Sequence, residues 1–167
     1  DPDISEEELS RRSSVIGYGA LKYAILKVSP EKNVSFSWEN ALSFEGDTGP
    51  YLQYTYARIC SIIDKSGRKI NKDADLSLLR EPDELNLAEM LSDFKSCVEE
   101  SARQLRVHLI AASLYSVSKS FNEFYHKLNI LKAQEDIKEA RLLLIDSARQ
   151  VLRNGLSLLG IEVLERM

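Results

Sequence analysis

The sequence predicts an all-α protein built as a helical bundle. Apolar residues recur at helical spacing in three separate stretches, 52–63, 110–128 and 142–159. This spacing gathers them on one face of a helix, which can then be buried against neighbouring helices. Prolines, capping residues and glycines lie near the ends of several stretches. No internal repeat or low-complexity tract is present, so the prediction is one bundle rather than a repeat array.

Composition and charge narrow the classes of protein. The chain has 167 residues, 44% of them hydrophobic and 29% charged, as in soluble globular domains. The net charge is −4, but residues 1–10 carry five acidic and no basic side chains, and the remaining 157 residues have a net charge of +1. A protein that holds DNA mainly through phosphates needs a larger positive excess. Without an apolar run of membrane length or a leader, we expect a cytoplasmic protein with no membrane contact.

The first element is expected to be a helix over residues 5–28. Ser5 and Glu8 have the spacing of a capping box, and Pro30 follows the end of the helix. The segment NVSFSWE, residues 33–39, then alternates apolar and polar side chains. Alternation of this kind predicts a short strand or an extended segment.

The next helix is expected to begin near Pro50, which suits a first turn because proline lacks an N–H group. Its apolar face consists of Leu52, Tyr56, Ile59 and Ile63. Tyr51, Tyr54 and Arg58 lie off that face, at positions i, i+3 and i+7, and form a second row. Two of the three tyrosines therefore lie off the apolar face, although a tyrosine on a helix is more often half-buried packing, with its hydroxyl at the surface, than a ligand contact.

Three further elements complete the bundle. Residues 64–84 are predicted to form a polar connection, followed by a helix that starts at Asp83 or Asn86, breaks near residues 95–96 and ends near Leu105. The clearest helix covers residues 109–128. The last helix carries apolar residues from Leu142 to Leu159 and is expected to stop at Gly160.

Residues that carry out catalysis are not evident. The only histidines, His108 and His126, are 18 positions apart on one predicted helix, or about 27 Å, too far to share a metal ion. Cys60 and Cys97 lack a metal-binding or redox spacing and are expected to be reduced and packed on helices. A phosphate-binding loop is also missing. We therefore predict no catalytic residue, no metal site and no cofactor site within this chain.

Five segments of the sequence nevertheless resemble one family. GDTGPYLQYTYARI (46–59), LYSVSKSFNEFYHK (114–127) and ARLLLIDSARQVLRNGLSLLGIEVLERM (140–167) resemble the C-terminal, DALR-type anticodon-binding domain of arginyl-tRNA synthetases. VIGYGALKYAIL and VSFSWENAL, within residues 15–42, resemble the end of the catalytic domain that precedes it. The chain departs from the usual pattern at Asp47, Tyr56 and Val107, where asparagine, histidine and proline are common.

This resemblance implies a division of the chain. Residues 1–46 would be the tail of the catalytic domain, and residues 47–167 the anticodon-binding bundle. Both ATP-site motifs of the family, of the His-x-Gly-His and Lys-Met-Ser-Lys types, are absent. The implication is a C-terminal fragment that is inactive alone, from an enzyme that uses ATP with magnesium and attaches arginine to tRNA. Its partners would be arginine tRNA and the catalytic domain of the same polypeptide.

The resemblance also implies which residues bind RNA. The family reads the central cytosine of the anticodon loop, and unpaired bases are held by stacking on aromatic rings and by hydrogen bonds to their edges. The positions implied as anticodon contacts are Tyr51, Tyr125 and Met167, with Tyr54, Arg58 and Asn129 as further candidates. Arg141, Arg149 and Arg153 form either a phosphate-facing row or a solvated helix face.

Two alternatives stay open at this point. One is a non-catalytic helical protein–protein adaptor, which would expose a continuous apolar stripe rather than tyrosines. The other is the anticodon-binding bundle of another class I synthetase, against which the Gly-Pro-Tyr-Leu-Gln-Tyr run argues.

Overall fold

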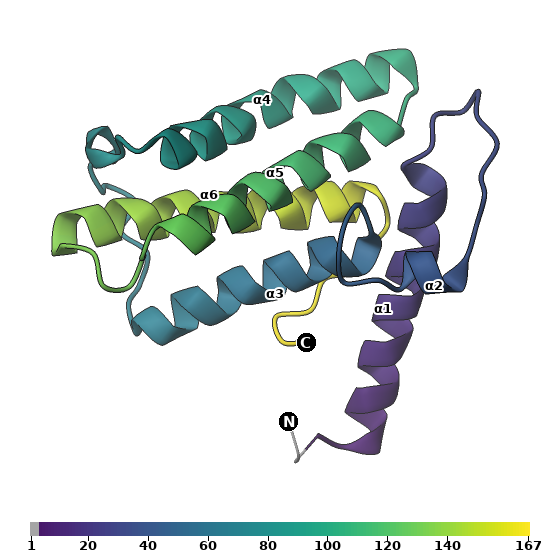
Figure 1. Cartoon of the computed structure of the whole chain (residues 1–167), viewed down its shortest axis with the longest axis horizontal. Coiled ribbons are helices and arrows are strands. Elements are labelled where there is room, and N and C mark those ends of the chain that lie inside the picture. Colours follow the sequence, from purple (N-terminus) through teal and green to yellow (C-terminus); the bar gives the residue numbers. More distant parts are fainter. Residues whose placement is uncertain (1–3) are drawn as a thin grey trace.

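The computed structural model describes residues 4–167 and confirms the all-α class (Figure 1). Residues 1–3, the start of the predicted 1–46 segment, lie outside this range. Between residues 4 and 167 there are six α-helices, one 3-10 turn and no strand. The elements are α1 (Glu6–Leu26), α2 (Trp38–Ala41), α3 (Gly49–Ser66), the 3-10 turn Leu76–Leu78, α4 (Pro82–Gln104), α5 (His108–Lys127) and α6 (Glu135–Leu158).

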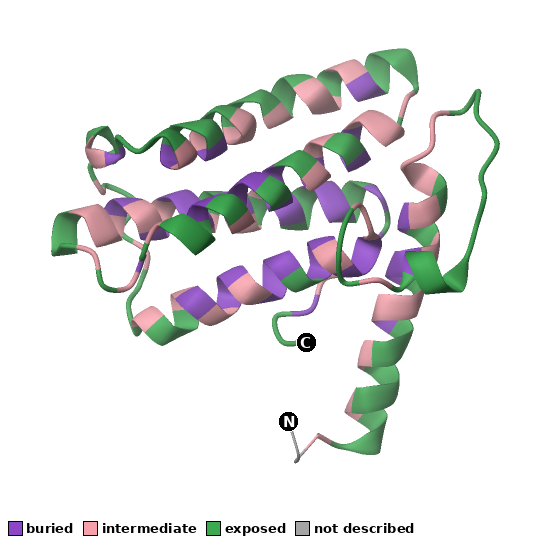
Figure 2. Ribbon diagram, viewed as in Figure 1, coloured by how far each residue is buried: buried purple, intermediate pink, exposed green. Residues whose placement is uncertain are grey.

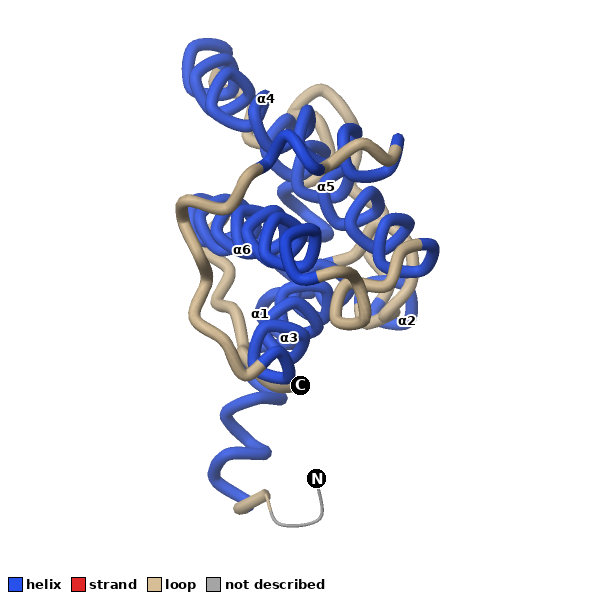
Figure 3. The backbone as a smooth tube through the Cα atoms, turned by 90° about the vertical axis from the view of Figure 1, so that its left-hand side faces the viewer, coloured by secondary structure: helices blue, strands red, loops and turns tan. Residues whose placement is uncertain are grey.

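Helices α3 to α6 form the bundle, and α1 crosses one end of it (Figures 1 and 3). α5 and α6 pack against each other, α3 packs against both, and α4 lies on the opposite side, against α5 and α6. Buried residues line the faces that these helices turn toward one another (Figure 2). The largest fully buried side chains include Tyr56, Phe121, Phe124, Leu114, Ile145 and Leu152.

The predicted apolar faces form this core. On α3, Leu52, Tyr56 and Ile59 are buried, whereas Ile63 is half-buried at the edge. The predicted faces of α5 and α6 are likewise buried, from Ile110 to Phe124 and from Leu142 to Leu159, whereas Leu128, at the end of the predicted α5 face, is half-buried. These three predictions are confirmed, because a run of residues at helical spacing can bury only one side of its helix.

Local signals set the ends of α3 and α6. Thr48 caps α3, since its hydroxyl accepts a 3.2 Å hydrogen bond from the Tyr51 amide. The helix ends at Gly67, whose φ of 64° is left-handed, so α3 extends into the predicted polar connection. Gly160, with a φ of 67°, follows Leu159, the C-cap of α6, so the helix stops where it was predicted to stop.

The predictions for α4 were partly wrong. It begins at Pro82, before the expected Asp83 or Asn86, and is continuous through Lys95 and Ser96, where a break was expected. The carboxylate of Glu84 accepts hydrogen bonds from the amides of Arg80 and Glu81, both at 2.9 Å, which fixes the earlier start. Lys95 and Ser96 are exposed on the solvent side of the helix, so their polarity does not interrupt it.

The segment NVSFSWE does not form a strand. Residues 34–37 have no regular structure, and Trp38 begins the short helix α2. Within this stretch, Ser37 has an extended backbone, with φ of −139° and ψ of 131°. A strand needs a neighbouring strand to satisfy its backbone groups, and residues 4–167 contain none.

Helix α1 has nearly the predicted bounds and packs across the start of α3 (Figure 3). Ser5 caps it, accepting a 3.2 Å hydrogen bond from the Glu8 amide. The two helices meet at Gly19 and Gly49, where a Cβ atom on Gly49 would lie 2.6 Å from the Gly19 carbonyl oxygen. Glycine at both positions allows this approach. No helix among residues 4–167 is long and apolar enough to cross a membrane.

Candidate functional site

A groove lies between α3, the end of α5 and the tail that follows α6. Its volume is about 610 Å³, and its lining includes four of the six predicted site residues, Tyr54, Arg58, Tyr125 and Met167. They come from three distant parts of the chain. We call this feature the tyrosine groove, defined by these four residues.

Arg58 lies between the two tyrosines. Its guanidinium carbon is 4.6 Å from the centre of the Tyr54 ring and 5.8 Å from that of Tyr125. The guanidinium also donates a 2.9 Å hydrogen bond to the Tyr54 hydroxyl. A cation over an aromatic face is attracted by the ring quadrupole. These contacts hold a planar, positively charged group at the wall of the groove.

The Tyr125 ring is supported from within the core. It is nearly parallel to the buried Phe121 ring, with centroids 6.0 Å apart and an interplanar angle of 15°. Tyr125 remains 38% exposed, as does Tyr54, and Met167 is 37% exposed. The tyrosine groove therefore presents two fixed aromatic rings and one flexible apolar side chain to solvent, a combination suited to stacking on a flat ligand.

Asn122 joins the groove to Tyr51. Its amide oxygen accepts a 2.6 Å hydrogen bond from Arg58, and its nitrogen donates to the Tyr51 hydroxyl at 3.0 Å. The same nitrogen lies 3.2 Å from the Thr55 hydroxyl and 2.9 Å from the Ser118 carbonyl oxygen. Sequence reasoning did not select Asn122, although it stands in the Phe-Asn-x-Phe-Tyr segment.

Tyr51 lies behind the groove rather than on its wall. It is half-buried, and its ring centre lies 5.9 Å from that of Tyr115. Burial raises the pKa of Tyr51, against the opposing effect of the Asn122 hydrogen bond, so the phenol stays protonated at neutral pH. Tyr51 thus reaches the groove only through Asn122 and Arg58.

Asn129 is not brought together with the other predicted residues. It follows α5, and its side-chain oxygen accepts a 3.0 Å hydrogen bond from the Lys132 amide. Its carbonyl oxygen accepts a 2.9 Å hydrogen bond from Arg141. These contacts stabilise the turn between α5 and α6.

The candidate row of arginines on α6 is largely engaged in ion pairs. Arg141 pairs with the buried carboxylate of Glu84 at 2.6 Å, with only 11% of its own side chain exposed. Arg149 pairs with Asp146, also at 2.6 Å. The cations that do line the tyrosine groove are Arg58, Lys65 and Arg166, next to one acid, Glu165.

Lys65, His126 and Arg166 are groove residues that sequence reasoning missed. Lys65 continues the row of Tyr51 and Arg58 by seven positions, so the helical spacing contained a signal for it. His126 follows Tyr125 directly, and the centroids of the two rings are 6.1 Å apart. Arg166 had no comparable signal, because the path of the tail depends on tertiary contacts.

No metal-binding cluster accompanies the groove in the described part of the chain. Among residues 4–167, no three His, Cys, Asp or Glu side chains gather in a way that could hold a metal ion. Cys60 and Cys97 are both free, the first buried and the second half-buried.

Comparison with protein families gives one match. The model described as "DALR anticodon binding domain" matches residues 52–167, which include all but the first three residues of α3, all of α4 to α6, and the tail.

Curated relatives and solved structures agree with this match. The arginine–tRNA ligase of Pyrococcus abyssi is 42% identical over 170 residues, which cover 99% of this chain and 27% of that protein. The structure of Thermus thermophilus arginyl-tRNA synthetase superposes with a TM-score of 0.89 and 37% identity, covering 100% of this chain and 29% of that one. The structure of Plasmodium falciparum arginyl-tRNA synthetase superposes with a TM-score of 0.84 and 29% identity. This match covers 94% of this chain and 28% of that one. The chain therefore spans less than a third of the length of these relatives.

Proposed function

Because this chain belongs to the DALR anticodon binding domain family, we propose that it binds the anticodon loop of an arginine tRNA. The observation that carries the proposal is the tyrosine groove, in which two half-exposed tyrosines and an arginine converge from α3 and α5. An unpaired base splayed from a loop can stack on such rings. The amino acid is inferred from the relatives, which are arginine–tRNA ligases.

Each predicted residue receives a role in this proposal. Tyr125 and Tyr54 stack on the central cytosine, Met167 covers its exposed edge, and Arg58 contacts the base or a phosphate. Tyr51 acts indirectly, through its hydrogen bond with Asn122. Asn129 supports the turn that follows α5. Lys65 and Arg166 supply the positive charge that attracts the RNA backbone.

The whole protein, in this proposal, is an arginine–tRNA ligase. In this proposal it attaches arginine to tRNA with ATP and magnesium in the cytoplasm, and both bind outside the residues of this chain. The chain would be inactive alone, and ATP would bind in the catalytic domain that precedes residues 47–167.

Exposed apolar side chains support the proposal that the segment before residue 47 contacts another domain. Several large apolar side chains of this segment are solvent-exposed, namely Tyr18, Ile25, Phe36, Trp38, Leu42 and Phe44. Large apolar patches on a soluble protein mark surfaces that another domain or protein covers. We assign this surface to the catalytic domain of the same polypeptide. A free-standing adaptor is disfavoured, because the tyrosine groove combines aromatic rings with cations rather than presenting an apolar stripe.

Binding to an anticodon stem-loop of arginine tRNA tests the proposal. The affinity of the chain is measured for the loop with its central cytosine and for the same loop with uracil, at two salt concentrations. We expect a preference for cytosine that Tyr125→Ala abolishes and Tyr51→Ala weakens. Trp38→Ala is the control, since Trp38 is an exposed aromatic residue on α2 and does not line the groove. Equal binding of both loops that vanishes with salt would reduce the role of the chain to backbone contacts.

A further inference from the structure

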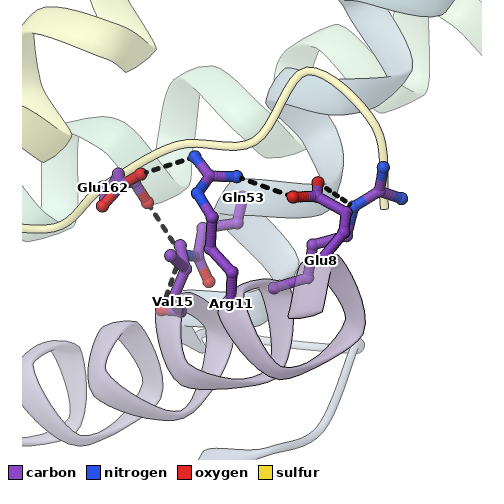
Figure 4. Close-up of polar contacts among 6 residues, drawn as sticks. Glu8, Arg11, Val15, Gln53 and Glu162 are labelled. Carbon is purple, nitrogen blue, oxygen red and sulfur yellow. Dashed lines mark hydrogen bonds and ion pairs between the residues drawn. The ribbon is translucent and has the colours of Figure 1, made fainter. Parts of the chain in front are cut away.

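Gln53 is a fully buried amide at the point where α1, α3 and the tail meet. Its side-chain nitrogen donates a 2.8 Å hydrogen bond to the Glu162 carbonyl oxygen and a 3.3 Å hydrogen bond to that of Val15 (Figure 4). One side chain of α3 thus binds the backbone of both α1 and the tail. The exposed groups around it, Arg11 and Glu162, form an ion pair at 3.1 Å above the amide.

The packing around Gln53 leaves no freedom for its side chain. A Cβ atom on Gly19 would lie 2.7 Å from the Gln53 nitrogen and 2.9 Å from its oxygen. The amide oxygen is buried and has no hydrogen-bond partner. An unpaired buried oxygen is unfavourable, and an apolar side chain of similar shape would avoid it. Packing alone therefore does not explain an amide at this position. The hydrogen bonds that its nitrogen donates to backbone carbonyl oxygens explain it better.

What the nitrogen holds is the tail that follows α6, residues 159–167. Gly160 reverses the chain, and Ile161 and Leu164 are buried. Lys22 donates to the Gly160 carbonyl oxygen at the start of the tail. Glu162 is then fixed by Gln53, and five residues later Met167 lines the tyrosine groove. Both Lys22 and Gln53 bind the backbone of this tail, and of the two only Gln53 is buried.

We propose that Gln53 is a positioning residue that sets the tail so that Met167 covers the tyrosine groove and contributes to base selection. This inference rests on the proposed function for the role of the groove, but its geometric part is independent of RNA. Gln53 touches no residue of the groove wall through its amide. It acts through the backbone of Glu162.

The geometric part is tested by NMR of methyl-labelled methionine. The chain has two methionines, Met90 and Met167, so each gives one assignable signal. In Gln53→Leu we expect the Met167 signal to move toward its random-coil position while the Met90 signal, from α4, stays unchanged. Gln53→Asn, one methylene shorter, provides a second variant if leucine prevents folding, and circular dichroism verifies the fold of each variant.

The functional part is tested by a double-mutant cycle with the cytosine and uracil loops. We expect Gln53→Leu and Met167→Ala each to reduce the preference for cytosine by roughly threefold to thirtyfold, and the double variant to lose no more than either single one. Ile145→Val, a core change on α6 outside the tail, is the control for a general loss of stability and should keep the preference.

These outcomes are separable. A Met167 signal that does not move in a folded Gln53 variant would overturn the inference, and so would additive effects in the cycle. If the unmodified chain fails to prefer the cytosine loop, the proposed function fails, while the Met167 signal still decides whether Gln53 positions the tail.

Discussion

The guanidinium of Arg58 on α3 donates a 2.6 Å hydrogen bond to the amide oxygen of Asn122 on α5. This bond links two helices at the tyrosine groove and fixes a cation that also contacts the rings of Tyr54 and Tyr125. Since the same amide donates to Tyr51, Asn122 connects the predicted site residue behind the groove with those on its wall.

Asn122 is not proposed to contact the RNA itself. Removing its amide should nevertheless weaken RNA binding, because Arg58 and Tyr51 would lose their shared partner. For Asn122→Ala we expect the Kd for the cytosine loop to rise roughly threefold to tenfold, about 0.7–1.4 kcal/mol. Fluorescence anisotropy with the labelled stem-loop measures this change. Asn86→Ala is the control, because Asn86 makes a comparable 3.0 Å hydrogen bond to Ser120, between α4 and α5. Equal losses in both variants would contradict a specific role for Asn122.

A positive charge at position 58 should not be enough for the function of Arg58. In Arg58→Lys the positive charge remains, but the planar fork that reaches Asn122 and Tyr54 is lost. We expect the preference for cytosine to fall while the salt dependence of binding stays nearly the same. Titrations of both loops at two salt concentrations measure the two quantities separately. A changed salt slope with an intact preference would assign Arg58 to a phosphate instead.

Arg141 is expected to serve stability rather than RNA binding. Arg141→Met would leave the carboxylate of Glu84, which is 1% exposed, buried without its partner. Breaking a buried pair in this way costs about 3–5 kcal/mol. Chemical denaturation measures the loss, and the salt slope of RNA binding should not change. Arg103→Met, at an exposed pair with Glu100, should cost only about 0–1 kcal/mol.

Tyr23 should make the bundle sensitive to alkali. Burial, with a 2.6 Å hydrogen bond to Asp47, raises the pKa of Tyr23 far above its usual value of 10. Because the folded state holds this proton more tightly than the unfolded state, the stabilisation is complete below pH 10 and is lost as pH rises above it. Unfolding free energies at pH 8 to 11 should fall less steeply in Tyr23→Phe than in the unmodified chain.

Two glycines should respond to alanine in opposite directions. In Gly49→Ala the new methyl group would meet the Gly19 carbonyl oxygen at 2.6 Å, so α1 and α3 must move apart, at a cost of about 1–3 kcal/mol. Gly17→Ala meets nothing within 4 Å in the middle of α1 and should stabilise by about 0.5–1 kcal/mol. Thermal unfolding of both variants checks the pair. A neutral Gly49→Ala would mean that the two helices separate easily.

The sequence predicted what depends on neighbours along the chain. The buried faces of α3, α5 and α6 follow from helical spacing, and the start of α3 follows from Thr48 and Pro50. The start of α4 was missed, because it depends on where the Glu84 carboxylate binds. The strand option at residues 34–37 failed for a similar reason, since alternation is meaningful only beside a partner strand.

The site residues that could be predicted are those that share one face of a helix or that lie in the segments resembling the family. Tyr54, Arg58, Tyr125 and Met167 were brought together in one groove, while Tyr51 lies behind it and Asn129 lies apart. Their roles in RNA binding stay a prediction. Asn122 could not be chosen from the sequence. Its proposed role depends on its hydrogen bond with Arg58, which is 64 positions away.

The contacts of Gln53 also have a kinetic consequence. They join Val15, Gln53 and Glu162, and the bonded residues are 38 and 109 positions apart along the chain. Helices α4 and α5, by contrast, are neighbours joined by a short turn. Loops of such different length close at very different entropic cost. The α4–α5 pair is therefore expected to assemble early, and the union of α1 with the tail to form last and to open first when the protein begins to unfold.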